Sequence, residues 1–364
     1  MKIALVYDRV NKFGGAERVL LTLHEIWPEA PLYTSVYHSQ SALWADDFKV
    51  IPSFLNKLAM ARRHHESFPW LMPLAFESFE FDEFDVVISI TSEFAKGIIT
   101  KPDTFHLCYC LTPTRYLWSG YQEYFQNTAF KFLSQPIVSY LRAWDQIASQ
   151  RPDEYLAISQ EVKKRIKKYY GRDSAVIYPP AETSFFKPGK KQKKKEYFLI
   201  VSRLVPYKRV DITIKAFNRL GLPLKIIGDG MVKRVLERMA KNNIEFLGQE
   251  LTDKEVLSYY QNCRALVFSG SEDLGLVSLE AQACGRPIIA FKAGGIPETM
   301  VEGKTGEFFY PQTAEALIET VSKFDEKRYN PDICQRQAQH FDVKIFKKQF
   351  KEYLENDVLQ AGCL

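Results

Sequence analysis

YFLIVSRLVPYKRVDITIKAFNRLGLPLKIIG, residues 197–228, decides the fold class of this chain. It opens with an apolar run of strand length at 197–204, continues with an amphipathic segment closed by Gly221, and returns to an apolar run at 223–228. Apolar residues at helical spacing indicate a helix, whereas short apolar runs bounded by turn residues are typical of buried strands. A strand, a helix and a second strand in this order predict two parallel strands joined by a crossover helix.

The same alternation continues on both sides of this stretch. Expected strands are residues 2–7, 32–37, 85–90, 106–111, 154–158 and 175–178 before it, and 244–248, 264–270 and 287–291 after it. Residues 16–27 read as an amphipathic helix, and further helical stretches separate the later strands. The sequence therefore predicts an α/β protein of two Rossmann-like, doubly wound domains, 1–182 and 196–341, facing each other across a cleft.

Composition excludes several classes of protein. The chain has 364 residues, 46% of them apolar and 14% aromatic, which is enough for a full core in each of two domains. Its apolar runs are all shorter than the roughly 18 to 20 residues that a membrane-spanning helix needs. The first ten residues, MKIALVYDRV, read as a strand rather than as a signal peptide. We therefore expect a cytoplasmic protein.

Charge and cysteine content argue against nucleic acid and metal. The net charge of +5 is concentrated in KKRIKK at 163–168 and KPGKKQKKK at 187–195, not spread over a face that could bind nucleic acid. The second run reads as a solvated linker; the first lies on a helix that is either solvated or in contact with anionic lipid headgroups. The six cysteines lack metal-ligand spacing and read as buried free thiols. With no Asp-x-Asp triplet in the chain, we expect no metal.

Residues 51–76 mix basic and aromatic side chains. Four consecutive basic or histidine residues, Arg62, Arg63, His64 and His65, stand among phenylalanine, tryptophan and leucine. Such a stretch can lie on a membrane interface, and it can equally be the packing of an irregular pair of helices. The sequence leaves both interpretations open.

Residues suited to ligand binding follow the predicted strands, where loops enter helices. Gly14 and Gly15 follow the first strand and allow backbone to approach a ligand at a helix N-terminus. In the second domain Arg203 and Lys208 follow a strand. The planar guanidinium of arginine can donate two parallel hydrogen bonds, and the ammonium of lysine is a compact positive charge, a combination that suits a diphosphate. Gly228 marks another loop whose backbone can approach a ligand closely. There is no GxGxxG or Walker sequence, so a dinucleotide or P-loop site is not expected.

Two carboxylates in SEDLGLVSLEAQACGRPIIAF, residues 271–291, are the least expected feature. Glu272 lies in the predicted loop and Glu280 on the second turn of a helix that starts near Gly275, amid apolar residues where a charge is costly. The backbone N–H groups at that helix start can receive an anion or a sugar oxygen. Two carboxylates at such a point suit the hydroxyl pairs of a ribose and a hexose. The alternative is that Glu272 is only a charge at the N-terminus of the helix and Glu280 a surface glutamate, although this leaves the apolar run around Glu280 unexplained.

These motifs resemble glycosyltransferase family 4, the retaining nucleotide-sugar transferases of GT-B fold. The resemblance is carried by the spacing of Glu272 and Glu280 and by GGAERVL, YYGRDSAVIYPP, SRLVPYKRVD and AGGIPE, which together span nearly the whole chain. It implies that Glu280 binds ribose hydroxyls and Glu272 a donor-sugar hydroxyl. The catalytic residues that it implies are Glu272, Arg203 and Lys208. The donor-binding residues that it implies are Gly14, Gly15, Gly228, Asp273, Leu274, Gly275, Leu276 and Glu280.

The segment YCLTPTRYLW at 109–118 resembles a branch that includes mannosyltransferases of bacterial surface polysaccharides. The resemblance thus implies transfer of a hexose, mannose above others, from a GDP-linked donor to a glycan or lipid-linked acceptor, without a metal or cofactor. Leu111 stands where the family usually has a histidine beside the C6 end of the donor sugar. This departure leaves two alternatives: a 6-deoxyhexose donor such as rhamnose or fucose, or a non-catalytic binder of nucleotide sugars. An epimerase would share the architecture, but we assign no further acid or base to it.

The end of the chain also resembles the family. DVKIFKKQFKEYLEND has Val343, Phe346, Phe350 and Leu354 at helical spacing, and the resemblance implies that helix 342–358 returns to the first domain. A lipid-linked acceptor and the basic-aromatic stretch at 51–76 together suggest peripheral contact with an anionic membrane, on the inner face of the cell membrane.

Overall fold

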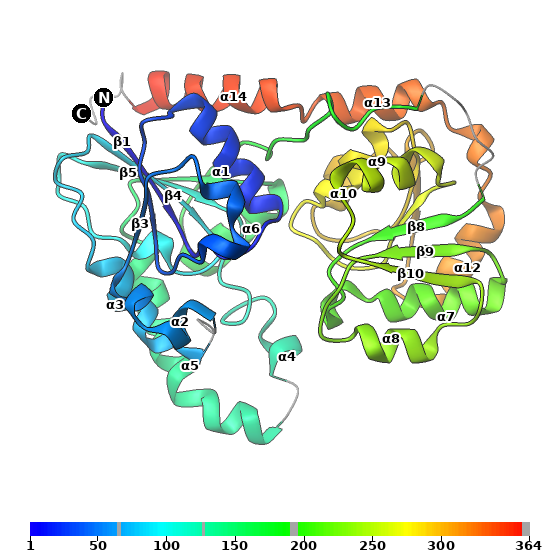
Figure 1. Cartoon of the computed structure of the whole chain (residues 1–364), viewed down its shortest axis with the longest axis horizontal. Helices are drawn as coiled ribbons and strands as arrows, with labels where there is room; N and C mark the ends of the chain where they lie inside the picture. The colour runs from blue at the N-terminus through cyan, green and yellow to red at the C-terminus, as the bar shows by residue number, and fades with distance from the viewer. Residues whose placement is uncertain (64–66, 126–127, 190–195, 359–364) are drawn as a thin grey trace. The chain divides into compact units, whose positions relative to one another are not determined.

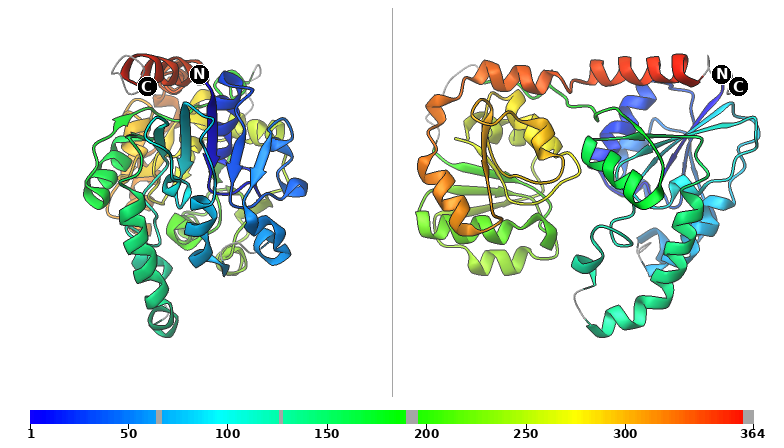
Figure 2. Two further views of the ribbon diagram at one scale, coloured as in Figure 1. Left: turned by 90° about the vertical axis from the view of Figure 1, so that its left-hand side faces the viewer. Right: turned by 180° about the vertical axis from the view of Figure 1, so that it is seen from behind.

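The computed structural model describes residues 1–63, 67–125, 128–189 and 196–358. The chain forms two compact units: Met1–Pro180 together with the chain from Phe346 onward, and Ala181–Ile345 (Figures 1 and 2). Three features singled out in the sequence lie outside the described residues: His64 with His65, the lysines of 190–195, and Cys363. The other five cysteines are free and buried, as predicted.

The first unit is built on a seven-stranded parallel sheet in the order β3-β2-β1-β4-β5-β6-β7. Its strands are β1 Ile3–Tyr7, β2 Leu32–Thr34, β3 Val50–Pro52, β4 Val86–Thr91, β5 Phe105–Cys110, β6 Glu154–Ala157 and β7 Ala175–Val176. Its helices are α1 Gly15–Ile26, α2 Ala59–Arg63, α3 Met72–Glu77, α4 Tyr121–Tyr124, α5 Thr128–Ala148 and α6 Gln160–Tyr170.

Helix α14, Val343–Glu352, passes from the second unit into the first, where a π-helical turn, Tyr353–Val358, follows it. Phe346 and Phe350 are one helical turn apart and fully buried, and both rings meet the ring of Tyr109 on β5 edge-on. Phe350 also packs against Trp27. Burying an aromatic side chain of this size contributes roughly 1.5 to 3 kcal/mol, so these contacts hold α14 on the first unit.

The second unit has a six-stranded parallel sheet in the order β10-β9-β8-β11-β12-β13. Its strands are β8 Phe198–Val201, β9 Leu224–Ile227, β10 Ile244–Gly248, β11 Leu266–Phe268, β12 Ile288–Phe291 and β13 Gly306–Phe309. Its helices are α7 Val210–Leu220, α8 Lys233–Met239, α9 Asp253–Asn262, α10 Leu276–Ala283, α11 Ile296–Thr299, α12 Ala314–Lys323 and α13 Pro331–Gln339. Helices α7, α8 and α12 cover one face of this sheet and α9, α10 and α13 the other (Figure 1).

Local sequence explains the βαβ unit from which the fold was predicted. Helix α7 buries Val210, Ile214 and Phe217 along one side, the spacing expected of an amphipathic helix. It stops at Gly221, which adopts the left-handed conformation (φ 68°) and whose N–H caps the carbonyl of Phe217 at 2.9 Å. Glycine suits this position because it has no Cβ to clash.

The predicted fold class is confirmed: both units are doubly wound, parallel α/β structures. Two strands were missed, β3 and β13. β3 is a three-residue, half-buried edge strand ending in proline, and neither its length nor its composition is typical of a strand. The predicted strands 32–37 and 175–178 are shorter than expected, at Leu32–Thr34 and Ala175–Val176, because their last residues leave the sheet as loops. Among the described helices, none combines the length and apolar character needed to cross a membrane.

Candidate functional site

Each sheet reverses its strand order once, between β1 and β4 in the first unit and between β8 and β11 in the second. At such a point the loops that leave the two strands diverge to opposite faces, and ligands of doubly wound proteins bind there, beyond the carboxyl ends of the strands. A ligand site is therefore expected at each of these two edges.

Lys208 and Glu272 meet at the edge between β8 and β11. Lys208 ends the 3₁₀ turn Pro206–Lys208 after β8, Glu272 lies in the loop after β11, and the two side chains form an ion pair. Their side chains are only 10% and 17% exposed. Charges this poorly solvated interact more strongly than a surface pair, and removal of one leaves the other uncompensated.

Glycines shape the backbone around this pair. A Cβ on Gly270 would lie 2.9 Å from the Cα of Lys208, and one on Gly294 would lie 2.2 Å from the carbonyl oxygen of Glu272. Gly294 has φ 65°, and the N–H of the following Gly295 donates to the same carbonyl at 2.8 Å. The two glycines of the AGGIPE motif thus allow its backbone to lie against the backbone of Glu272, and this contact fixes the loop that carries the Glu272 carboxylate.

Helix α10 begins at the residues predicted to receive a ligand. Gly275 is its N-cap in a left-handed conformation (φ 92°) and offers no side-chain cap. Leu274 is buried, with 2% of its surface exposed, so only its backbone is available for a ligand. The N-terminal N–H groups of a helix and its dipole favour negative charge, which suits this end of α10 to a phosphate.

Glu280 lies on the second turn of α10, as predicted, and is half-buried. Its Oε2 accepts a hydrogen bond of 2.8 Å from the hydroxyl of Tyr260 on α9. Burial, together with the neighbouring Glu280 carboxylate, raises the pKa of Tyr260 well above its ordinary value, so the phenol stays protonated and donates. Tyr260 was missed because a tyrosine in an amphipathic helix carries no sequence signal for a partner twenty residues away.

Arg203 and Gly228 lie at neighbouring loops of the same edge. Arg203 is exposed, and its Nη2 donates to the hydroxyl of Tyr207 at 2.8 Å. Gly228 (φ 140°) lies so close to the end of β8 that a Cβ would fall 1.9 Å from the carbonyl oxygen of Ser202. The second unit thus holds Arg203, Lys208, Gly228, Glu272 and Glu280 on adjoining elements.

Gly14, Gly15 and Leu111 belong to the first unit. Gly14 is the extended N-cap of α1 and provides no side-chain cap. Beneath it, Glu17 is buried, accepts from the Tyr7 hydroxyl at 2.6 Å, and lies 3.2 Å from where a Cβ of Gly14 would be. Burial raises the pKa of Glu17, although the Tyr7 hydrogen bond opposes this.

Leu111 directly follows β5, donates its N–H to the carbonyl of Thr91 at 2.8 Å, and packs half-buried against the first-unit core. Asp8, buried after β1, organises the loop after β4. It accepts N–H groups of Ser92 at 2.7 Å and Phe94 at 2.8 Å, besides the hydroxyl of Thr91 at 2.8 Å. The backbone around the Leu111 position is therefore fixed by a buried carboxylate.

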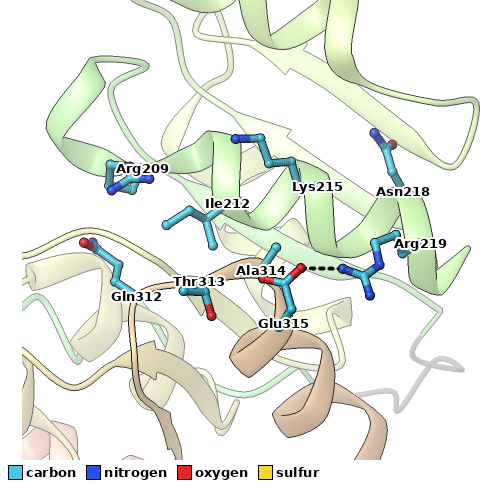
Figure 3. A pocket seen from close by; sticks show the side chains of 9 residues that line it. All are labelled: Arg209, Ile212, Lys215, Asn218, Arg219, Gln312, Thr313, Ala314 and Glu315. Carbon is cyan, nitrogen blue, oxygen red and sulfur yellow. Dashed lines mark hydrogen bonds and ion pairs between the residues drawn. The ribbon is translucent and has the colours of Figure 1, made fainter.

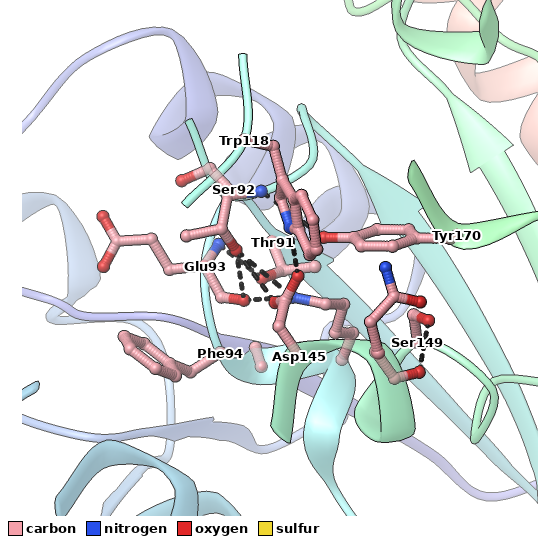
Figure 4. A network of polar contacts seen from close by, with 12 residues as sticks. Thr91, Ser92, Glu93, Phe94, Trp118, Asp145, Ser149 and Tyr170 are labelled. Carbon is pink, nitrogen blue, oxygen red and sulfur yellow. Dashed lines mark hydrogen bonds and ion pairs between the residues drawn. The ribbon is translucent and has the colours of Figure 1, made fainter. Parts of the chain in front are cut away.

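A second buried charge lies in the same network (Figure 4). Lys96 pairs with Asp145 at 2.5 Å, with side chains 2% and 1% exposed, and Asp145 also accepts from Trp118 Nε1 at 2.7 Å and Thr114 Oγ1 at 3.0 Å. Burial by itself would lower the pKa of Lys96, but the Asp145 carboxylate outweighs it and raises the pKa. The partners are too far apart in sequence to have been predicted.

A surface groove lies between α7 and the start of α12 (Figure 3). Its cations are already paired: Arg219 with Glu315 at 2.6 Å, and Arg209 and Lys215 with Asp211. None of the residues predicted to bind the donor lines this groove, so we place the candidate site at the β8–β11 edge instead.

A comparison with protein families matches the second unit. Residues 181–341 match the model of the family described as glycosyl transferases group 1. They cover almost the entire second unit. The loop of Lys208, the loop of Glu272 and the helix of Glu280 all fall within the matched residues.

Curated relatives align with less than half of the chain. The chain is 32% identical over 164 residues to the uncharacterized glycosyltransferase MJ1178 of Methanocaldococcus jannaschii, covering 44% of this chain and 46% of that protein. It is 30% identical over 193 residues to the GDP-mannose-dependent alpha-(1-6)-phosphatidylinositol monomannoside mannosyltransferase of Mycolicibacterium smegmatis, covering 45% and 50%. The aligned part thus spans about half the length of these relatives.

Solved structures match the whole chain. HepE of Anabaena in complex with UDP and glucose has a TM-score of 0.72 at 21% identity and covers 98% of this chain and 100% of that one. Sucrose-phosphate synthase of Thermosynechococcus elongatus has a TM-score of 0.74 at 15% identity and covers 99% and 100%. At these identities the likeness concerns the fold, and both units together form the GT-B fold that the sequence predicted.

Proposed function

We propose that this chain is a retaining glycosyltransferase that moves a hexose from a nucleoside diphosphate sugar to a glycan or lipid-linked acceptor in surface polysaccharide synthesis. The observation that carries the proposal is the largely buried Lys208–Glu272 pair beside the glycine-lined start of α10. It offers a cation, a carboxylate and the N-terminal N–H groups of a helix within one group of loops, the set that a sugar diphosphate requires.

Each residue has a distinct task in this proposal. Lys208 and Arg203 neutralise the diphosphate. Glu272 accepts a hydroxyl of the donor sugar, and Glu280 accepts the ribose hydroxyls. The bond from the sugar C1 to the diphosphate oxygen breaks, and the acceptor oxygen bonds to C1 on the same face. The acceptor hydroxyl gives its proton to the departing diphosphate oxygen, and fixed cations stabilise the negative charge of the diphosphate.

The reaction is tested by incubating the chain with nucleotide sugars and candidate acceptors and following release of the nucleoside diphosphate. Proton NMR of the product should show the anomeric configuration of the donor. Tight donor binding without turnover in any acceptor screen would favour the alternative, a non-catalytic binder of nucleotide sugars.

For the donor we propose mannose carried by GDP. Support comes from the mycobacterial relative, whose name specifies GDP-mannose and which shares 30% identity over the matched region. The HepE complexes contain UDP, which favours a UDP-linked hexose instead. Thermal unfolding against a panel of GDP and UDP sugars distinguishes the two, because a ligand stabilises the folded state in proportion to ln(1 + [L]/Kd). A larger shift with UDP-glucose than with GDP-mannose would overturn the GDP assignment.

We also propose that transfer needs no metal ion. Arg203, Lys208 and the start of α10 supply the positive charge that a diphosphate requires. Activity should persist in excess EDTA. Loss of activity that Mg²⁺ or Mn²⁺ restores would contradict this.

Finally, we propose peripheral contact between the first unit and an anionic membrane. On α5, whose N-terminal half extends away from the sheet of its unit (Figure 2), Phe132 and Leu133 are 75% and 74% exposed. Residues 131–144 contain Lys131 and Arg142 and no acid, which suits an anionic surface. Sedimentation with phosphatidylglycerol vesicles at low salt should retain the wild type and lose Phe132→Ser/Leu133→Ser. Binding to neutral phosphatidylcholine alone, or none at all, would refute it.

A further inference from the structure

Tyr260 is a buried tyrosine whose hydroxyl touches a residue of the proposed donor site. None of its surface is exposed, and the edge of Phe186 packs on its ring at a centroid distance of 5.7 Å and 84°. The Sγ of Cys263 bonds its carbonyl at 3.3 Å. Its helix, α9, is fixed at its N-terminus by a capping box of Thr252 and Glu255. A ring held by tertiary contacts on several sides has little rotamer freedom, so its hydroxyl occupies a defined position.

That hydroxyl donates to one specific oxygen, Oε2 of Glu280, at 2.8 Å. A hydrogen bond from a neutral donor to a carboxylate is stronger than one between neutral groups and fixes the plane of the carboxylate. Glu280 itself is only half-buried, on the second turn of α10. A glutamate with several rotatable bonds would otherwise lose entropy on binding a ligand, and an interaction that holds it beforehand reduces that cost.

We infer that Tyr260 is a positioning residue: it orients the Glu280 carboxylate to accept a vicinal pair of hydroxyls, and so contributes to selection of a ribonucleotide over a deoxyribonucleotide donor. This inference rests on the proposed function, in which Glu280 binds ribose. It adds a residue outside the two-glutamate motif and specifies what that residue acts on. It also assigns a ligand-related role to α9.

The test compares nucleotides that differ only in their ribose hydroxyls. GDP and UDP, and the 2′,3′-dideoxy form of each, are titrated calorimetrically into wild type, Tyr260→Phe, Glu280→Gln and the double variant. The preference for the ribo form should fall about tenfold in Tyr260→Phe, the effect of losing one charge-assisted hydrogen bond. It should fall at least as far in Glu280→Gln, and the double variant should resemble Glu280→Gln because both act through one carboxylate.

Tyr109→Phe is the matched control. Tyr109 is also fully buried and donates its hydroxyl at 2.8 Å, but to the carbonyl of Ile177 in the first unit. Its loss should lower the unfolding temperature as Tyr260→Phe does, while the ribo preference stays as in wild type. This separates positioning from a general loss of stability.

The outcomes are distinguishable. If Glu280→Gln lowers the ribo preference and Tyr260→Phe does not, Tyr260 is only structural and the inference is wrong, while the proposed function stands. If neither variant changes the preference, the ribose role of Glu280 in the proposed function is wrong as well. A fall of equal size in Tyr109→Phe would also overturn the inference.

Discussion

Gly294→Ala tests whether the loop of Glu272 must be held as the structure has it. Gly294 adopts φ 65°, a left-handed conformation that costs an alanine about 1 kcal/mol. In addition, its new Cβ would lie 2.2 Å from the carbonyl oxygen of Glu272, whereas real Cβ atoms essentially never approach closer than 3.0 Å. The two segments must therefore separate by about 0.8 Å, a value that follows from the two distances.

A displacement of this size acts directly on the proposed sugar contact. Glu272 bears the displaced carbonyl on its own backbone, so its carboxylate and its partner Lys208 shift with it. Misplacement of a reacting group by about 1 Å costs roughly 100-fold in rate. We expect turnover of the nucleotide sugar to fall by about that factor, with a smaller change in affinity for the free nucleoside diphosphate.

The matched control is Gly303→Ala. Gly303 has almost the same backbone conformation, φ 73°, but a Cβ there would meet nothing within 4 Å. Both variants should lose about 1 kcal/mol of stability to backbone strain, measured by urea unfolding, and only Gly294→Ala should lose transfer. If the two variants have the same turnover, the close contact does not position Glu272 and the reasoning is wrong.

Three further predictions concern single residues. Glu280→Ala should weaken nucleotide binding by about 1 to 3 kcal/mol, whereas Glu272→Ala should reduce turnover more than affinity; equal effects on free nucleoside diphosphate binding would contradict the division of roles. Leu111→His should shift donor preference toward a 6-hydroxylated sugar. The reason is that leucine covers the methyl group of a 6-deoxy sugar, which is worth about 0.8 kcal/mol, but offers a 6-hydroxyl no hydrogen-bond partner. Competition of GDP-mannose with GDP-rhamnose or GDP-fucose in both proteins checks this, and an unchanged preference refutes it. His106 is buried and bonds Ser89 at 2.8 Å, and its burial lowers its pKa to about 3 from 6.5. Between these values the unfolded chain binds one proton more than the folded chain. The free energy of unfolding should therefore decrease by about 1.4 kcal/mol for each unit by which the pH is lowered across that window, more steeply than in His106→Gln. Parallel slopes of the two proteins in urea unfolding would exclude this cause.

Much of the candidate site could be predicted because its residues lie close to strand ends in the sequence. Lys208 follows β8 by seven residues and Glu272 follows β11 by four, and the carboxyl ends of parallel strands share one edge. The glycines of the AGGIPE motif indicated that the backbone there lies close to another group, but the sequence did not show which group this is. That partner, the carbonyl of Glu272, lies 22 residues away and became apparent only in the structure.

The sequence by itself determined the class of fold and the chemistry available at the second unit, because alternating apolar runs specify local elements and motifs place charges at the ends of strands. It did not determine the strand order, the edge strands β3 and β13, or the partners of buried polar groups. Tyr260 with Glu280, and Lys96 with Asp145, pair across distances of 20 and 49 residues, which no local period encodes. Only tertiary packing brings such groups together, because an unpaired charge or hydroxyl in a core is too costly and the fold must supply each with a partner from another element.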